Sequence, residues 1–104
     1  MKINIFGSTG EIGKKSLDII KKYFPKLKVN LLCANSNINL ILKQSLIFKP
    51  KYIYLDDINA SNKLKLKLDK NIRILNFQEL SKYLEESFSD YTILAVSGYK
   101  SLYY

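Results

Sequence analysis

The sequence predicts an α/β fold, a doubly wound parallel sheet of about five strands with helices on both faces. Short apolar stretches typical of buried strands begin near residues 2, 28, 52, 72 and 91. Segments with the apolar spacing of amphipathic helices separate these stretches, as the crossovers between parallel strands require. A glycine-rich turn follows the first strand directly and marks the first strand-to-helix junction.

The first strand covers residues 2–6, and the first helix covers residues 11–23 and ends before Pro25. Between them the chain reads Gly7-Ser8-Thr9-Gly10-Glu11-Ile12-Gly13, a G-x-x-G-x-x-G turn. A strand, a glycine turn and a helix in this order are typical of a Rossmann-like dinucleotide-binding unit. The same spacing also occurs as a plain turn in other α/β proteins, so the turn alone does not establish a ligand.

Each glycine of this turn has its own expected task. Gly7 turns the chain off the strand because it tolerates positive φ. Gly10 lets the backbone approach a pyrophosphate, and Gly13 lets the helix pack closely on the sheet. The N–H groups at the start of the helix then face the phosphates, and Ser8 and Thr9 add hydroxyl donors.

The remaining elements alternate in the same way. We expect strands at residues 28–33, 52–55, 72–75 and 91–96, and helices at 38–48, 60–68 and from 77 to about 88. The lysine–leucine alternation from Lys63 to Leu68 has the period of a strand, but the crossover requires a helix, which is our prediction. The last helix is expected to begin after Asn76 as its N-cap. The expected inner faces are Leu17, Ile20 and Phe24 in the first helix, Ile38, Leu42 and Leu46 in the second with Ile41 and Phe48 beside them, and Phe77, Leu80 and Leu84 in the last.

Length and composition fit one globular domain, with 104 residues, 47% hydrophobic and 25% charged. No apolar run approaches the roughly 20 residues that cross a bilayer. The amino terminus does not resemble a signal peptide, because Lys2 leads directly into a strand. A single cysteine, Cys33, forms no internal disulfide. We therefore expect a cytoplasmic protein that is not bound to a membrane.

The net charge of +8 raises the possibility of nucleic-acid binding. All basic residues except Arg73 are lysines, and they are scattered along the chain without the clustering or interleaved aromatics of a binding face. Lysine, asparagine and isoleucine are abundant together, which indicates a general compositional bias. We therefore expect no nucleic-acid partner, although the charge favours anionic small molecules in general.

Catalytic side chains are scarce. The chain has no histidine, and no catalytic residue is assigned. Asp56 and Asp57 follow the third strand as a pair that can bind a metal, but such a pair more often starts a turn or caps a helix. With no further ligand nearby, we predict no metal site.

A second polar turn, Asn35-Ser36-Asn37, follows the second strand roughly twenty residues after the glycine turn. NAD-binding domains often place an acid there for the ribose 2′-hydroxyl. The turn contains no acid, which weakly favours NADP. An equally good interpretation is a polar loop in which Asn37 caps the next helix. The loops at 7–13, 34–37 and 97–98 are expected to meet at the carboxyl ends of the strands.

Several strings together resemble the amino-terminal part of the 1-deoxy-D-xylulose 5-phosphate reductoisomerase family. The glycine turn and the following Ser16-Leu17-Asp18-Ile19-Ile20 match its amino-terminal signature. The resemblance spans essentially the whole chain in register. Further matching places are Ala34 with Asn37, Lys49-Pro50-Lys51-Tyr52, Asp56-Asp57 and Ala95-Val96-Ser97-Gly98.

The resemblance implies an NADPH-dependent oxidoreductase of non-mevalonate isoprenoid biosynthesis that also uses Mg²⁺ or Mn²⁺. Such enzymes rearrange 1-deoxy-D-xylulose 5-phosphate, a sugar phosphate, and reduce the product to 2-C-methyl-D-erythritol 4-phosphate, and they act as homodimers. Two positions depart from the family pattern: Asn35 replaces a common Gly, and Ser36 replaces a Lys or Arg that meets the 2′-phosphate. The cofactor contacts that the resemblance implies are Gly7, Thr9, Gly10, Glu11, Ile12, Asn35, Ser36 and Asn37.

Family members are several times longer, and their metal ligands and an Asn-Lys-Glu segment of the cofactor site belong after Tyr104. We therefore expect an NAD(P)-binding domain over residues 1–104, incomplete at its C-terminal end and without a catalytic domain. Such a fragment is expected to be inactive alone, and a separate chain is a possible source of the catalytic half. The alternatives are a stand-alone dinucleotide-binding or regulatory module and, less in keeping with the residues, a basic nucleic-acid-binding domain.

Overall fold

The computed structural model describes residues 2–86 and the backbone of residues 91–94. Strands and helices alternate along the chain without exception within these residues. The expected loop at 97–98, the matching segment Ala95-Val96-Ser97-Gly98 and the end of the fifth strand lie outside them. The elements are β1 (Lys2–Phe6), α1 (Glu11–Tyr23), β2 (Lys28–Ala34), α2 (Ile38–Phe48), β3 (Tyr52–Leu55), α3 (Ile58–Lys65), β4 (Arg73–Ile74), α4 (Phe77–Glu86) and β5 (Tyr91–Leu94).

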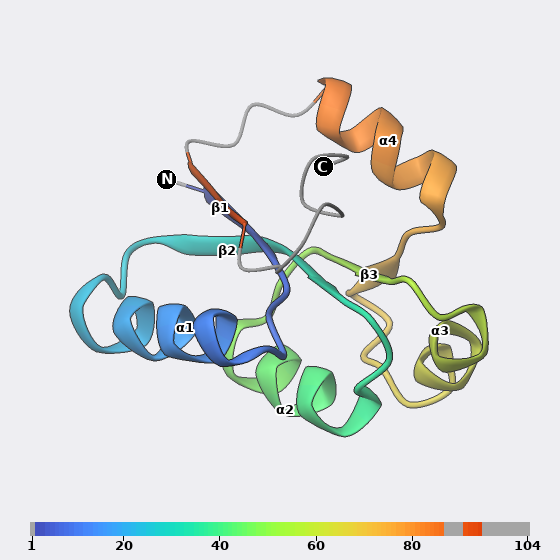
Figure 1. Ribbon diagram of the computed structural model, residues 1–104, viewed down its shortest axis with the longest axis horizontal. Coiled ribbons are helices and arrows are strands. Elements are labelled where there is room, and N and C mark those ends of the chain that lie inside the picture. Colours follow the sequence, from blue (N-terminus) through green and yellow to red (C-terminus); the bar gives the residue numbers. More distant parts are fainter. Residues whose placement is uncertain (1, 87–90, 95–104) are drawn as a thin grey trace.

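The five strands form one sheet in the order β4-β3-β2-β1-β5, and every pair is parallel. The chain moves outward from β1 to β4 and then crosses back to place β5 on the other side of β1 (Figure 1). In the register, Phe6 of β1 lies beside Cys33 of β2 and Leu94 of β5. The predicted doubly wound sheet is confirmed, and its strand order reverses at β1.

Helices cover both faces of the sheet, as predicted. α1, α2 and α3 pack on one face, and α4, orange in Figure 1, is the one described helix on the other. On the three-helix face, Leu17, Ile41 and Leu64 are almost fully buried against sheet residues such as Ile5 and Ile53. On the other face, Leu80 of α4 joins a smaller core of Phe6, Leu31, Cys33, Tyr54 and Leu75.

Three expected core residues are exposed. Phe24 is 56% exposed because the helix ends at Tyr23, and Phe24 is its C-cap with φ −130°. Leu46 is 75% exposed, because the buried face of α2 is centred on Ile41 and includes Ser45. Phe77 is 62% exposed at the first position of α4, and its ring centroid lies 6.5 Å from that of Tyr54 at an interplanar angle of 64°.

The ambiguous lysine–leucine segment is helical, as predicted, although α3 ends at Lys65, before the expected end. Leu64 is fully buried and Leu66 is 89% exposed, so the leucines do not share one face as they would in a strand. Within the described residues, no helix combines the length and apolarity needed to span a bilayer.

Candidate dinucleotide-binding site

The candidate site lies at the carboxyl edge of the sheet, where β1 runs between β2 and β5. In open α/β sheets, ligands bind outside the carboxyl ends of the strands at the point where strand order reverses. The glycine turn leaves β1 at this point and leads into α1. The topology therefore places the predicted turn where a ligand crevice is expected.

The backbone of the glycine turn is tied to the end of the neighbouring strand. Gly7 has φ 80°, the left-handed conformation that was expected of it. The N–H groups of Gly7 and Ser8 both donate to the carbonyl oxygen of Cys33, at 2.8 and 3.0 Å. The N–H of Gly10 donates to the Gly7 carbonyl oxygen at 3.1 Å. These bonds fix the turn against β2 before any ligand binds.

Gly13 packs against the turn itself. A Cβ atom at Gly13 would lie 2.1 Å from the carbonyl oxygen of Gly7 and 2.7 Å from the Cα of Ser8. The close approach that was expected between the helix and the sheet is therefore an approach between the first turn of α1 and the glycine turn. Any larger residue at Gly13 pushes the helix away from the turn.

The N-terminus of α1 differs from those of the other three described helices. Asn37 caps α2 by accepting from Leu40 N at 3.2 Å, and Asp57 caps α3 by accepting from Ala60 N at 3.1 Å. Asn76 caps α4 by accepting from Glu79 N at 2.8 Å. Gly10, at the N-cap of α1, has no side chain and makes no such bond. The first-turn N–H groups of α1 therefore remain for an anion, which the helix dipole also favours.

A buried glutamine that the sequence analysis did not single out supports the turn from below. Gln44 of α2 is 5% exposed, and its Nε2 donates to the carbonyl oxygen of Ser8 at 2.7 Å. Ser8 is fully buried, and its Oγ and the Oε1 of Gln44 have no hydrogen-bond partner among the described residues. The sequence does carry an indication of this role, because Gln44 stands three residues after Ile41 on the apolar stripe of α2.

The other predicted contacts are distributed around this turn. Thr9 is half-buried, whereas Gly10, Glu11 and Ile12 are exposed at the start of α1. On the next loop, Asn35, Ser36 and Asn37 are also exposed. The side chain of Asn37 caps α2, as the second interpretation of that turn predicted. The cofactor contacts of all these residues remain predictions.

The ionisable groups behind the turn favour their neutral forms. Burial and, secondarily, the charge of Asp56 raise the pKa of the Cys33 thiol well above its usual value. Burial, the charge of Asp56 and a hydrogen bond with its carboxylate, together with a smaller effect of Cys33, raise the pKa of Tyr54 to about 12. A buried neutral thiol is a poor nucleophile, so Cys33 contributes through its carbonyl oxygen rather than its sulfur.

The described residues offer no metal centre. No three side chains of His, Cys, Asp or Glu within residues 2–86 come together in a way that could hold an ion. Asp57 caps α3, and Asp56 lies close enough to affect Cys33 and Tyr54. The acid pair is therefore engaged in local structure.

Comparison with known proteins gives a consistent result. The profile of 1-deoxy-D-xylulose 5-phosphate reductoisomerase matches residues 3–104. The reductoisomerase of Thermoanaerobacter sp. strain X514 is 36% identical over 105 residues, covering 97% of this chain and 26% of that protein. That of Pelagibacter ubique is 38% identical over 105 residues, covering 97% of this chain and 27% of that protein.

The fold also matches solved structures. A DOX-P reductoisomerase in complex with NADPH, fosmidomycin and magnesium superposes with a TM-score of 0.86 at 23% identity, over 98% of this chain and 26% of the other. The Zymomonas mobilis reductoisomerase in complex with NADPH superposes with a TM-score of 0.79 at 24% identity, over 93% of this chain and 26% of the other. The chain spans about a quarter of the length of these relatives. By the profile match over nearly its whole length, the chain belongs to the 1-deoxy-D-xylulose 5-phosphate reductoisomerase family.

Proposed function

We propose that residues 1–104 form the NADPH-binding domain of a 1-deoxy-D-xylulose 5-phosphate reductoisomerase. The observation that carries this proposal is the uncapped N-terminus of α1, held by the glycine turn at the reversal point of the sheet. The family match supports it, as do the relatives solved in complex with NADPH. The complete enzyme would rearrange 1-deoxy-D-xylulose 5-phosphate and reduce the resulting aldehyde to 2-C-methyl-D-erythritol 4-phosphate in isoprenoid biosynthesis.

The residues of this chain would bind and orient the cofactor. NADPH supplies the hydride when bound. The free N–H groups of the first turn of α1, from Glu11 onward, would hold its pyrophosphate, and Thr9 would add a hydroxyl donor. The backbone at Gly10 is exposed and carries no Cβ, which allows close approach. Ser8 Oγ and Gln44 Oε1 are buried polar atoms without partners among the described residues, which fits a polar group or an ordered water behind the pyrophosphate.

The second polar turn would lie toward the adenosine end. Asn35, Ser36 and Asn37 present short uncharged side chains, and no carboxylate in this turn repels a 2′-phosphate. The cap that Asn37 gives to α2 uses its Oδ1 and leaves its amide N–H groups to donate to a phosphate oxygen. This arrangement supports a preference for NADPH over NADH.

The remaining parts of the reaction are also proposals. Because the chain spans about a quarter of its relatives, the substrate site, the divalent metal and the homodimer contacts are assigned to polypeptide beyond these residues, continuous with this chain or separate from it. The acids within residues 2–86 form no group that could hold an ion, so we assign none of these residues to Mg²⁺ or Mn²⁺. The cytoplasm is the proposed compartment.

Calorimetric titration of the purified chain with NADPH, and with NADH for comparison, tests the proposal. Gly10→Val should abolish NADPH binding, because its side chain blocks the backbone approach to the pyrophosphate. Lys26→Val, an exposed position before β2 at the opposite edge of the sheet, is the matched control and should bind normally. Equal binding by both variants, each with an unchanged circular-dichroism spectrum, would refute the placement of the pyrophosphate.

A further inference from the structure

Basic residues that are scattered in the sequence gather at the amino edge of the sheet, opposite the glycine turn. Lys2 and Lys28 begin β1 and β2 and are register partners, Lys51 directly precedes β3, and Arg73 begins β4. Parallel strands bring all their amino ends to one edge, so the lysine pattern that looked dispersed becomes a row of cations. The parallel topology thus brings together basic residues that are far apart in the sequence.

Part of this row borders a hollow of about 950 Å³ on the face covered by α2 and α3. The volume falls within the range of about 300–1,000 Å³ that is typical of small-molecule sites. The hollow lies between the end of α2, the segment 67–72 and the start of β2. Five lysines line it together with a single acid: Lys2, Lys28, Lys49, Lys51, Lys67 and Asp69.

The five lysines of this hollow outnumber its one acid. Lys28, Lys49 and Lys67 are exposed and form no ion pair within the described part of the chain. The carboxylate of Asp69 accepts a hydrogen bond from Asn71 N at 2.9 Å and keeps its charge, so it offsets one of the five lysine charges. Like charges gathered around one hollow repel each other, and a bound anion removes that repulsion.

The wall of the hollow is apolar. Val29 is buried at the start of β2, and Leu42, Phe48, Leu68 and Ile72 are partly buried in the core behind the hollow. Leu46 stands at the rim and is 75% exposed. The exposure of Leu46 contradicted the expected helix face, and it places an apolar side chain beside the lysines.

The backbone of Lys49 has an unusual conformation at this rim. It is the only non-glycine residue with positive φ in the described chain, with φ 46° and ψ 58° at the C-cap of α2. Glycine or asparagine usually occupies that conformation. Its N–H donates to the Ser45 carbonyl oxygen at 2.9 Å, and Pro50 behind it is buried.

A second hollow on the α4 face is a weaker candidate. It shares Lys2 and Lys51 with the first, but Arg73 is already paired with Glu79, and Glu86 also lines it. Its charges are therefore partly balanced.

From the lysine rim and the apolar wall, we propose that the hollow bordered by Lys28, Lys49 and Lys67 binds a small organic phosphate that carries an apolar group. The phosphate meets the lysines, and the apolar group lies against Leu46 and the residues behind it. The site is independent of the proposed cofactor site, because the two lie at opposite edges of the sheet.

Calorimetry with octyl phosphate tests this proposal, with inorganic phosphate and octanol as the two halves of the probe. Octyl phosphate should bind more tightly than either half, and its affinity should fall as KCl is raised. Lys28→Gln with Lys67→Gln should weaken it about fivefold. The matched control, Lys21→Gln with Lys63→Gln, removes two exposed lysines elsewhere and should leave the affinity unchanged.

Leu46→Gln separates the two parts of the site. Because Leu46 is exposed, the fold should be retained, while octyl phosphate binding weakens about threefold and inorganic phosphate binding stays constant. Equal effects of the two lysine pairs would overturn the proposal. A second contradicting result would be that octyl phosphate does not bind, whereas the chain sediments with phosphatidylglycerol vesicles in a way that depends on Lys28 and Lys67. That result would assign the lysines to a membrane surface.

Discussion

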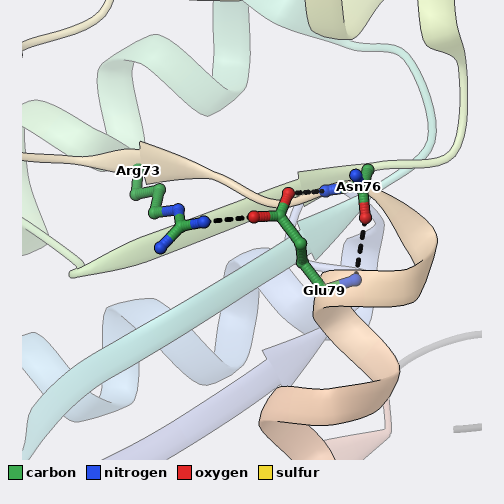
Figure 2. Close-up of polar contacts among 3 residues, drawn as sticks. All are labelled: Arg73, Asn76 and Glu79. Carbon is green, nitrogen blue, oxygen red and sulfur yellow. Dashed lines mark hydrogen bonds and ion pairs between the residues drawn. The ribbon is translucent and has the colours of Figure 1, made fainter.

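The N-termini of α1 and α4 show two ways of starting a helix after a parallel strand. At α4, the protein satisfies its own backbone: Asn76 Oδ1 accepts from Glu79 N, and Glu79 Oε1 accepts from Asn76 N at 3.0 Å (Figure 2). The other carboxylate oxygen of Glu79 pairs with Arg73. This reciprocal arrangement is a capping box, in which the N–H groups of Asn76 and Glu79 are already bonded and are not available to a ligand.

At α1, no side chain performs that role. The glycine turn uses its own N–H groups on Cys33 and Gly7, and the first-turn donors of the helix have no side-chain cap. A helix without a side-chain N-cap lacks a stabilisation of roughly 1 kcal/mol. Its free first-turn N–H groups are, however, available to bind an anion. The feature that distinguishes the candidate site is therefore a helix start without a side-chain cap, next to a turn that is fixed by backbone hydrogen bonds.

The largest expected effect is at Gly13, where the turn and α1 touch. Gly13→Ala places a Cβ 2.1 Å from the Gly7 carbonyl oxygen, so the backbone must move. We expect a loss of about 3 kcal/mol in the free energy of unfolding and loss of NADPH binding. Urea denaturation and calorimetry measure the two effects. A stability equal to that of the unaltered chain would show that the turn is not packed against the helix in this way.

The next effect is at Gln44, which holds the turn from α2. Gln44→Leu removes the donor to the Ser8 carbonyl oxygen and leaves that oxygen buried and unpaired. We expect a loss of about 2 kcal/mol in the free energy of unfolding and weaker NADPH binding, because the turn is no longer fixed. The same pair of measurements, urea denaturation and calorimetry, checks both effects.

Ser45→Ala is the control for Gln44. Ser45 is also buried, but its Oγ donates to Leu42 O within the same helix at 2.7 Å. This variant should keep the NADPH affinity. If both variants lowered the affinity equally, the effect would come from α2 in general and not from the bond to the turn.

Much of this site could be predicted from local sequence, because its main features are local. The glycine turn, the element boundaries near it and the caps at Asn37 and Asn76 depend on residues within a few positions of one another. The role of Gln44 depends on a contact across 36 residues, and its amide belongs to a residue type that pattern analysis assigns to the surface. The row of cations likewise depends on strand order, which no single segment encodes.

The three residues that were predicted to be buried but are exposed, Phe24, Leu46 and Phe77, have a related physical explanation. Helical spacing identifies an apolar face only when its centre is known, and α2 is apolar on several sides. At about 100° per residue, Leu46 lies about 140° from Ile41, which faces the sheet. Phe24 and Phe77 were assigned to faces of helices, but they occupy a C-cap and a first helical position, where neighbouring turns do not enclose a side chain.

A smaller effect is expected at α4, on the capped side of the comparison. Asn76→Ala removes the acceptor for Glu79 N, and the free energy of unfolding should fall by about 1 kcal/mol. NADPH binding should not change, since α4 begins after β4 and away from the reversal point of the sheet. Thermal unfolding and calorimetry of the same preparation check both statements. Reduced NADPH affinity would mean that the two helix starts are coupled.

The smallest effect is a pH dependence at Glu79. The hydrogen bond from Asn76 N and, less strongly, the Arg73 guanidinium lower the pKa of Glu79 below its usual 4.5. A carboxyl group with a lowered pKa in the folded state stabilises the fold above its unfolded pKa, and that contribution disappears as pH falls through the folded value. Unfolding midpoints between about pH 6 and pH 3 should therefore fall less steeply for Glu79→Gln than for the unaltered chain.

Glu85→Gln is the matched control for Glu79, because it removes an exposed carboxylate from the same helix but lies outside the capping box. This variant should leave the slope of the unfolding midpoint against pH unchanged. Identical slopes for all three proteins would show that the capping box gives α4 no stability that depends on the charge of Glu79. The contrast between α4 and α1 would then depend on the Asn76 side chain alone.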